Sequence, residues 1–241
     1  MRTRGLSNFR LKVIGLVFVA LSAVGTAFVR KGMPTDINQA SLYELTWSIV
    51  LEVVSWIGFP IYAWLLVGGY RHTSSMAKYG ARLLLVGIVA EVPYDIATMG
   101  TVFDMSSQNP AFALVVILIV LYALDRVTTY RGWSFFLGFV VVVAGLLWLL
   151  LLNIGVRLGH LPGGVVMLAF ALIFRYLASR ENWMNFVGCL VGALAGIFPA
   201  FGLAILHFRN EEEGMGTTAK WTFYAAYPVL LLVIGLAGLL S

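Results

Sequence analysis

The sequence is poor in cysteine and in charge, and both shortages limit what the protein can be. Its single cysteine, Cys189, lies in an apolar stretch, which excludes an internal disulfide and a cysteine-based metal cluster. Charged residues make up 11% of the chain, against about 25% in an average soluble domain. Hydrophobic residues make up 61%, and mean hydropathy is +0.93. This composition excludes a soluble domain and indicates a multi-spanning membrane protein.

Several motifs of soluble enzymes are also missing. The chain has no Walker loop, dinucleotide fingerprint, HExxH or GxSxG, so ATPase, Rossmann oxidoreductase and zinc protease functions have no support. The excess of 16 Lys and Arg over 11 Asp and Glu does not require a nucleic-acid partner. In a membrane protein it is typical of cytoplasmic loops and of contact with anionic lipid.

Apolar stretches separated by short loops predict a single domain, residues 1–241, that forms an all-α bundle of about eight membrane spans. The predicted spans are 11–29, 56–70, 82–99, 110–124, 133–152, 162–179, 184–206 and 221–240. With the N-terminus inside, eleven of the sixteen Lys and Arg residues fall on the inner side. This bias predicts a protein of the cytoplasmic (inner) membrane with both termini in the cytoplasm.

The segment 41–55 is treated separately from the span that follows it. Ser41-x-x-Glu44 is a capping box. Ser41, Glu44, Ser48, Glu52 and Ser55 recur at three or four residues and form a polar stripe opposite Leu, Val and Trp. The pattern predicts an amphipathic helix on the outer membrane surface before the second span. One long tilted helix through both segments is the alternative.

Glu91 and Asp95 are the strongest candidates for a chemical role. Glu91 lies nine residues after Arg82, about 13 Å along a helix. That depth is near the centre of a hydrocarbon core about 30 Å thick. A charge there costs at least about 2.5 kcal/mol, so the side chain is expected to face a partner or a polar cavity. The pair is interpreted as a general base or a polar binding site, or alternatively as a structural anchor between spans.

The loop before this span is basic. Arg71, His72, Lys78 and Arg82 form a mouth that suits the phosphates of an acyl-CoA or a lipid headgroup. The alternative is ordinary positive-inside charge.

Two further groups have a simpler interpretation. Asn109 is expected to cap the helix that follows it, with Pro110 in its first turn. His160 and His207 with the run Glu211–Glu213 form a weak candidate site, because such an acidic run is more typical of a solvated loop.

These residues occur in an order and spacing that resembles the TraX family. The marks are Phe59-Pro60, Gly69-Tyr70-Arg71-His72-Thr73, Lys78-Tyr79, Arg82-Leu83, Glu91-Val92-Pro93-Tyr94-Asp95, Asn109, Phe112 and Tyr227-Pro228. Members of the family are multi-spanning inner-membrane proteins, named for pilin N-acetylation and similar to other transmembrane acyltransferases. The resemblance implies transfer of an acetyl or acyl group from cytoplasmic acyl-CoA to an envelope protein or glycolipid. The implied roles are a base or acceptor site at Glu91 and Asp95, CoA binding at Arg71, His72, Lys78 and Arg82, and substrate binding at Tyr94, Asn109 and Tyr227.

The chain departs from the family pattern at several polar positions. The family usually carries an Asp-His pair late in the first span, where Ser22 and Ala23 stand here, and Gly68 and Leu230 replace a family Glu and His. Acyl transfer normally needs a base to remove a proton, and His is the commonest. The departures favour a catalytically degenerate member that binds lipid or another membrane protein in an envelope complex.

The alternative is an active acyltransferase. It would use acetyl-CoA or another acyl-CoA as co-substrate, with no metal and no tightly bound cofactor. A transporter is a weaker interpretation, since the sequence shows no inverted repeat and no ladder of intramembrane charges.

Overall fold

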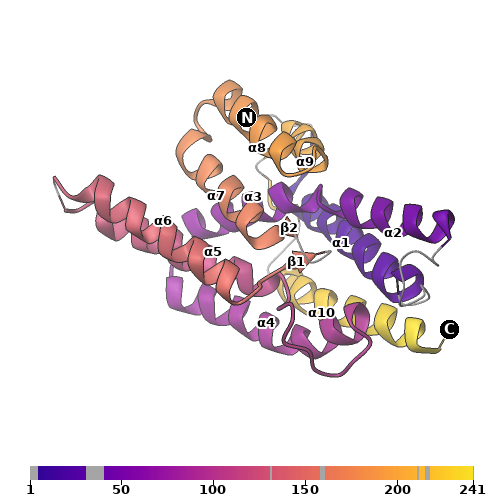
Figure 1. Cartoon of the computed structure of the whole chain (residues 1–241). Helices are drawn as coiled ribbons and strands as arrows, with labels where there is room; N and C mark the ends of the chain where they lie inside the picture. Colours follow the sequence, from indigo (N-terminus) through magenta and orange to yellow (C-terminus); the bar gives the residue numbers. More distant parts are fainter. Residues whose placement is uncertain are drawn as a thin grey trace.

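A computed structural model describes residues 5–30, 41–130, 132–157, 161–210, 212–214 and 218–240. These residues form an all-α bundle with one pair of two-residue strands, which confirms the all-α part of the predicted fold class (Figure 1). The elements are α1 (Asn8–Val24), the π-helical η1 (Gly25–Arg30), α2 (Leu42–Ser55), α3 (Gly58–His72), α4 (Met76–Thr98), α5 (Ala111–Val127), α6 (Ser134–Leu151), β1 (Val156–Arg157), β2 (Leu161–Pro162), α7 (Gly163–Leu177), α8 (Glu181–Leu194), α9 (Phe198–His207) and α10 (Thr218–Leu240).

Four helical segments of the described chain are long and apolar enough to cross a membrane. They are Asn8–Val29, Leu42–His72, Ser134–Leu151 and Trp221–Leu240. The second of these joins α2 and α3, which are separated only by the turn at Trp56 and Ile57. The segments support a membrane protein, as composition predicts.

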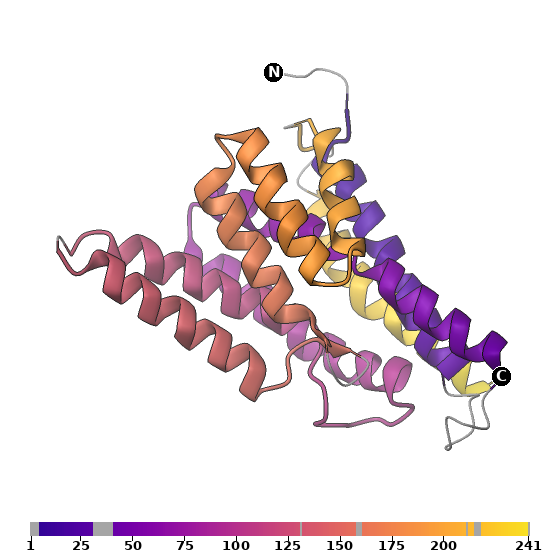
Figure 2. The ribbon, with the colours of Figure 1, turned by 45° about the horizontal axis from the view of Figure 1, so that its top comes forward.

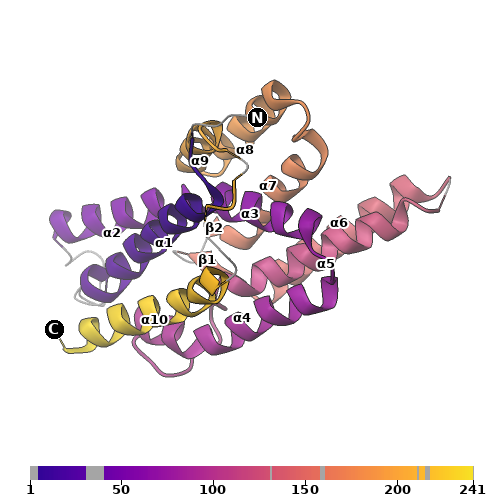
Figure 3. The ribbon, with the colours of Figure 1, turned by 180° about the vertical axis from the view of Figure 1, so that it is seen from behind.

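The helices α1, α4 and α10 run in the same direction (Figures 2 and 3). Lys12, near the start of α1, lies 5.6 Å from the ring centroid of Phe223, near the start of α10. At the other end, a Cβ on Gly238 of α10 would lie 2.8 Å from the Cβ of Ala27. We call the end where these helices begin the near face and the end where they finish the far face. The last helix therefore ends on the far face, opposite to the start of α1, whereas the sequence predicted both termini on one side.

The reason lies in the predicted span 184–206, which folds back on itself as the α8–α9 hairpin. A helix of 14 residues, such as α8, is about 21 Å long and falls short of a 30 Å core. The chain reverses at Gly196 and Ile197, whose φ angles are +100° and +71°. Arg209, after α9, pairs with Glu181, at the start of α8, at 3.3 Å, so both ends of the hairpin lie on the near face. In this structure the predicted span 184–206 is therefore two short helices, α8 and α9, whose outer ends lie together.

The predicted helix at 41–55 forms as α2 and begins with the predicted capping box at Ser41. Its polar stripe, however, points into the protein, because Ser48, Glu52 and Ser55 are buried. The side chains on its outer side are apolar and exposed: Leu42, Tyr43, Trp47, Ile49 and Val50. A helix lying on the membrane surface would turn its polar stripe to water, so the orientation of the stripe argues against a surface helix. The alternative of one long tilted helix is met only in part, because the turn at Trp56 and Ile57 interrupts the segment between α2 and α3.

The main core lies where α3, α5 and α7 pack together. Its fully buried side chains include Ile61, Ile117, Leu121, Phe170 and Phe174. The helix α6 packs along α5 on the outside of this core (Figure 2), and within α6 only Gly145 and Leu149 are buried. An apolar helix with so little burial is typical of a lipid-facing element.

Candidate functional site

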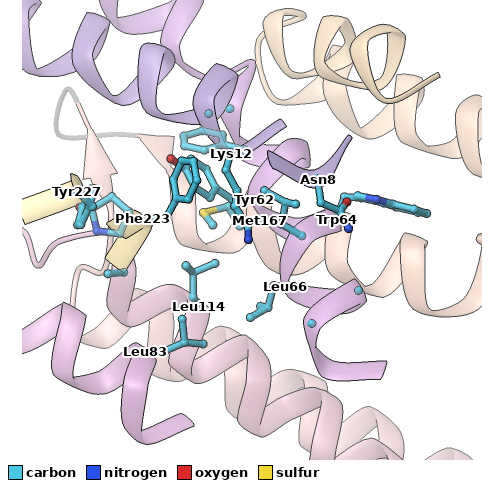
Figure 4. Close-up of a pocket in the computed structure, with 18 of the residues that line it drawn as sticks. Asn8, Lys12, Tyr62, Trp64, Leu66, Leu83, Leu114, Met167, Phe223 and Tyr227 are labelled. Carbon is cyan, nitrogen blue, oxygen red and sulfur yellow. The ribbon is translucent and has the colours of Figure 1, made fainter. Parts of the chain in front are cut away.

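A cavity of about 1120 Å³ lies between α1, α2, α3, α4, α5, α7 and α10. Figure 4 shows Tyr62 and Phe223 on one side of it and Leu83 and Leu114 on the other. The cavity is large enough for a drug-sized or larger ligand, because such sites typically measure about 300–1,000 Å³.

The near-face end of the cavity is lined by basic side chains. They are Lys12, Arg71, His72, Arg82, Arg175 and Arg209. Three of the four residues predicted to bind CoA phosphates, Arg71, His72 and Arg82, therefore line one cavity. The fourth, Lys78, is not among the lining residues.

Contacts with neighbouring helices hold the arginines of this mouth in place. Arg71 donates to the carbonyl oxygens of Phe174 and Arg175 at 2.9 and 3.2 Å, which ties the end of α3 to the end of α7. Arg175 pairs with Asp125 of α5, which also accepts a hydrogen bond from Tyr70. Arg71 and Arg175 are thus held beside each other at one opening.

The opposite end of the cavity contains a carboxylate, Glu52. Its Oε2 accepts a hydrogen bond from Ser22 Oγ at 2.8 Å, and its Oε1 accepts one from Trp56 Nε1 at 3.2 Å. Glu52, Ser22 and Ser55 all line the cavity, and the Glu52 residue is 3% exposed. The sequence identified Glu52 only as one member of a polar stripe. The spacing of three or four residues within that stripe was the signal that its side chains share one face of the helix.

Glu91, predicted as a base, is not among the residues that line the cavity. Its Oε2 accepts hydrogen bonds from the backbone N–H (3.2 Å) and the side-chain amide of Asn109. The same amide donates to Gly87 O at 2.8 Å, and Asn109 Oδ1 accepts from Ala111 N at 2.9 Å. Asn109 is fully buried. The Glu91–Asn109 pair therefore fastens α4 to the start of α5.

Tyr94 and Asp95 lie on the far-face side of the cavity, against the loop that follows α4. Asp95 Oδ2 accepts from Asp104 N at 2.9 Å, whereas its buried Oδ1 has no hydrogen-bond partner among the described residues. The Tyr94 hydroxyl lies 3.1 Å from Ser107 Oγ. In the loop itself, hydrogen bonds from Ser106 hold the pKa of Asp104 below its usual value. Tyr227, the third predicted substrate residue, does line the cavity.

The weak histidine site finds little support in the described part of the chain. His207 Nδ1 lies 3.6 Å from Glu181 Oε1 on the near face, while His160 and Glu211 fall outside the described residues. No group of three or more His, Cys, Asp or Glu that could hold a metal ion occurs in the described segments.

The sequence matches the TraX protein family over residues 9–238, nearly the whole chain. The chain belongs to the TraX family. No curated protein and no solved structure matches it. The TraX marks separate into two places in the fold: Arg71 and His72 lie at the mouth of the cavity, and Tyr94 and Asp95 lie near its far end.

Proposed function

We propose that this TraX-family protein is a membrane acyltransferase that binds acyl-CoA in the cavity from the near face. One observation carries the proposal: the basic mouth and the buried Glu52 carboxylate line the same cavity. Arginine guanidinium groups suit phosphates because they form charge-assisted, often bidentate hydrogen bonds. The 3′,5′-ADP part of CoA would stay at the mouth, and the pantetheine arm would carry the thioester toward Glu52.

The chemistry at the far end of the cavity would use Glu52 as the general base. An amine or hydroxyl of the acceptor attacks the thioester carbonyl carbon, forming a C–N or C–O bond and breaking the C–S bond. Glu52 takes the proton from the nucleophile and returns it to the departing CoA thiolate. General base catalysis of this kind contributes about 10²–10⁴-fold. Glu52 would thereby take the role that the sequence suggested for Glu91 and Asp95, and the acceptor would be an envelope protein or glycolipid.

The proposal includes an orientation in the inner membrane with the near face in the cytoplasm. Described basic residues on that face are Arg10, Lys12, Arg71, Lys78, Arg82, Arg126, Arg175, Arg180 and Arg209, whereas Arg30 and Arg157 belong to the other end. This asymmetry follows the positive-inside rule. The chain would then cross the membrane seven times, at α1, α2–α3, α4, α5, α6, α7 and α10, with α8–α9 entering halfway from the cytoplasm.

A second function is favoured by one specific feature. Ser22 and Ala23 stand where the family usually carries an Asp-His pair. The group beside Glu52 at this place is therefore the Ser22 hydroxyl, which donates a hydrogen bond to Glu52 and is a much weaker base than a histidine. A degenerate member would keep the cavity as a binding site for lipid or for a partner in an envelope complex, without turnover.

Binding of acetyl-CoA to the detergent-purified protein, measured by calorimetry, tests the proposal. We expect micromolar affinity that the Arg71→Ala/Arg82→Ala variant abolishes. The control is Arg126→Ala, which removes a near-face arginine that stacks on Tyr122 outside the cavity. Absence of binding at millimolar acetyl-CoA, or equal loss in the control, would contradict the proposal.

A further inference from the structure

Beside the far end of the cavity lies a small buried cluster that the proposed chemistry does not use. The cluster, which we call the plug, consists of Ala23, Tyr94, Ala97 and Leu231, each at most 1% exposed. Val19 and Tyr227 pack against it, and Val19, Tyr227 and Leu231 also line the cavity. The plug therefore borders the cavity through Leu231, on the side of the far face.

Hydrogen bonds tie the plug to the far-face loop 99–110. The Tyr94 hydroxyl lies 3.1 Å from Ser107 Oγ, which in turn donates to Val156 O at 2.8 Å. One residue further along α4, Asp95 accepts the backbone N–H of Asp104. The buried second oxygen of Asp95, Oδ1, has no hydrogen-bond partner among the described residues. The contact between Asp95 and the loop therefore leaves one acceptor unsatisfied. An unsatisfied buried acceptor lowers the stability of the closed arrangement relative to one that exposes it to water.

Two helices that border the plug carry a proline in their interiors. Pro93 directly precedes Tyr94 in α4, and Pro228 directly follows Tyr227 in α10. An internal proline removes a backbone hydrogen bond and is a common cause of helix bending. The two helices run parallel with close backbones, because a Cβ on Gly235 would lie 2.9 Å from Ala97 N. A bend at both prolines would move the two main side chains of the plug, Tyr94 and Leu231, together.

We propose that the plug is a gate through which the acceptor reaches the cavity from the far face, and that bending at Pro93 and Pro228 opens it. The gate assigns a role to the Glu-Val-Pro-Tyr-Asp and Tyr-Pro marks, most of which lie outside the basic mouth. Only the identity of what passes, the acyl acceptor, rests on the proposed function. The burial of the plug itself is a property of the fold.

Cysteine accessibility tests the gate without any enzymatic assay. The background is Cys189→Ser, which removes the single native thiol. The reporter is Val19→Cys, which faces the cavity and packs on the plug. Oriented vesicles and intact spheroplasts are exposed to a membrane-impermeant maleimide from one face at a time. We expect labelling from the near face and at least tenfold slower labelling from the far face.

The gate is then loosened with Tyr94→Phe, which removes the hydroxyl anchor and keeps the ring. We expect far-face labelling to rise severalfold while near-face labelling stays constant. Tyr130→Phe, an exposed tyrosine outside the cavity and the plug, serves as the matched control and is expected to change neither.

Two results would overturn the gate. One is equally fast labelling from both faces before any loosening. The other is unchanged far-face labelling in both Tyr94→Phe and Leu231→Ala, when both variants elute as the native species. Neither result depends on acyl-CoA, so failure of the gate and failure of the acyltransferase proposal are separate outcomes.

Discussion

At the residue scale, three carboxylates within the helices have different surroundings and therefore different roles. Glu52 lines a cavity with two hydrogen-bond donors beside it, whereas Glu91 is held by Asn109 and Asp95 by the far-face loop. A carboxylate whose oxygens bind the backbone of a neighbouring element fixes that element in place. Only one that borders open volume can meet a substrate.

Glu52→Gln is expected to remove transfer and to retain binding of acetyl-CoA. Loss of the base should slow transfer by about 10²–10⁴-fold, since glutamine keeps the shape but takes no proton. The rate is measured as release of CoA thiol from acetyl-CoA in proteoliposomes supplied with envelope extract. Glu91→Gln is the matched control and should leave the rate close to wild type, because Glu91 does not line the cavity. The reverse pattern would return the catalytic role to Glu91.

Asn109→Ala should destabilise the fold and leave acetyl-CoA affinity unchanged in the protein that remains folded. The substitution removes the side-chain donor to the Gly87 carbonyl and to the Glu91 carboxylate, which keeps only the backbone N–H of residue 109, and this costs about 1–3 kcal/mol. At about 2–4 °C for each kcal/mol, the thermal midpoint in detergent should fall by several degrees. Gln108→Ala is the neighbouring control, since the Gln108 side chain bonds only the Met105 sulfur among the described contacts. A midpoint equal to that of the control would contradict the anchoring role.

At the element scale, the break between α2 and α3 meets the turn of the α8–α9 hairpin beside Glu52. The α2–α3 segment is broken at Trp56 and Ile57, and the turn of the α8–α9 hairpin packs on Trp56, which donates to Glu52. Gly202 of α9 lies against Ile57 O and Pro60. Broken helices at membrane depth are tolerated where they are buried in protein or line a cavity, and here they place a charged side chain.

The hairpin's support of Trp56 can be measured with two glycines of similar conformation. Gly196 and Gly132 both have φ near +90° to +100°, so an alanine is strained at either position by about 1–2 kcal/mol. At Gly196 the new Cβ would also lie 2.8 Å from the Trp56 ring, whereas at Gly132 it meets open space. Gly196→Ala should therefore lower the thermal midpoint more than Gly132→Ala does. Equal shifts of the thermal midpoint would mean that the tip of the hairpin does not pack tightly against Trp56.

At the scale of the whole molecule, the direction of the helices decides where the chain ends. Because α10 lies parallel to α1, the end of α10 lies on the face opposite to the start of α1. The apolar stretches predicted eight spans with both termini on one side, since the apolar run 184–206 has the same composition whether it crosses the membrane or turns back.

An epitope placed after the last residue should be accessible to antibody on the outside of intact spheroplasts, and one placed before the first residue should not. This follows from the parallel arrangement of α1 and α10 with the basic near face in the cytoplasm. An internal control is an epitope in the loop after α5, near Asp125, which should also be protected. If both terminal epitopes are protected, the eight-span arrangement is restored.

The sequence alone determined the class of molecule and much of its local structure. High hydropathy and low charge required membrane helices, Ser41 and Glu44 specified the capping box that opens α2, and the ordered marks around Arg71 and Tyr94 identified the family. These features depend on composition or on residues within one helical turn, so they can be read without knowing what each helix packs against.

The tertiary structure alone decided which face of each helix meets the cavity and where a long apolar run folds back. Lipid and protein interior are equally apolar, so hydrophobic residues do not distinguish a lipid-facing side from a packed one. The polar stripe of α2 was visible in the sequence, but its direction depended on Ser22 of α1 and Trp56. For the same reason the roles of Glu52, Glu91 and Asp95 could be separated only once their neighbours from other helices were in place.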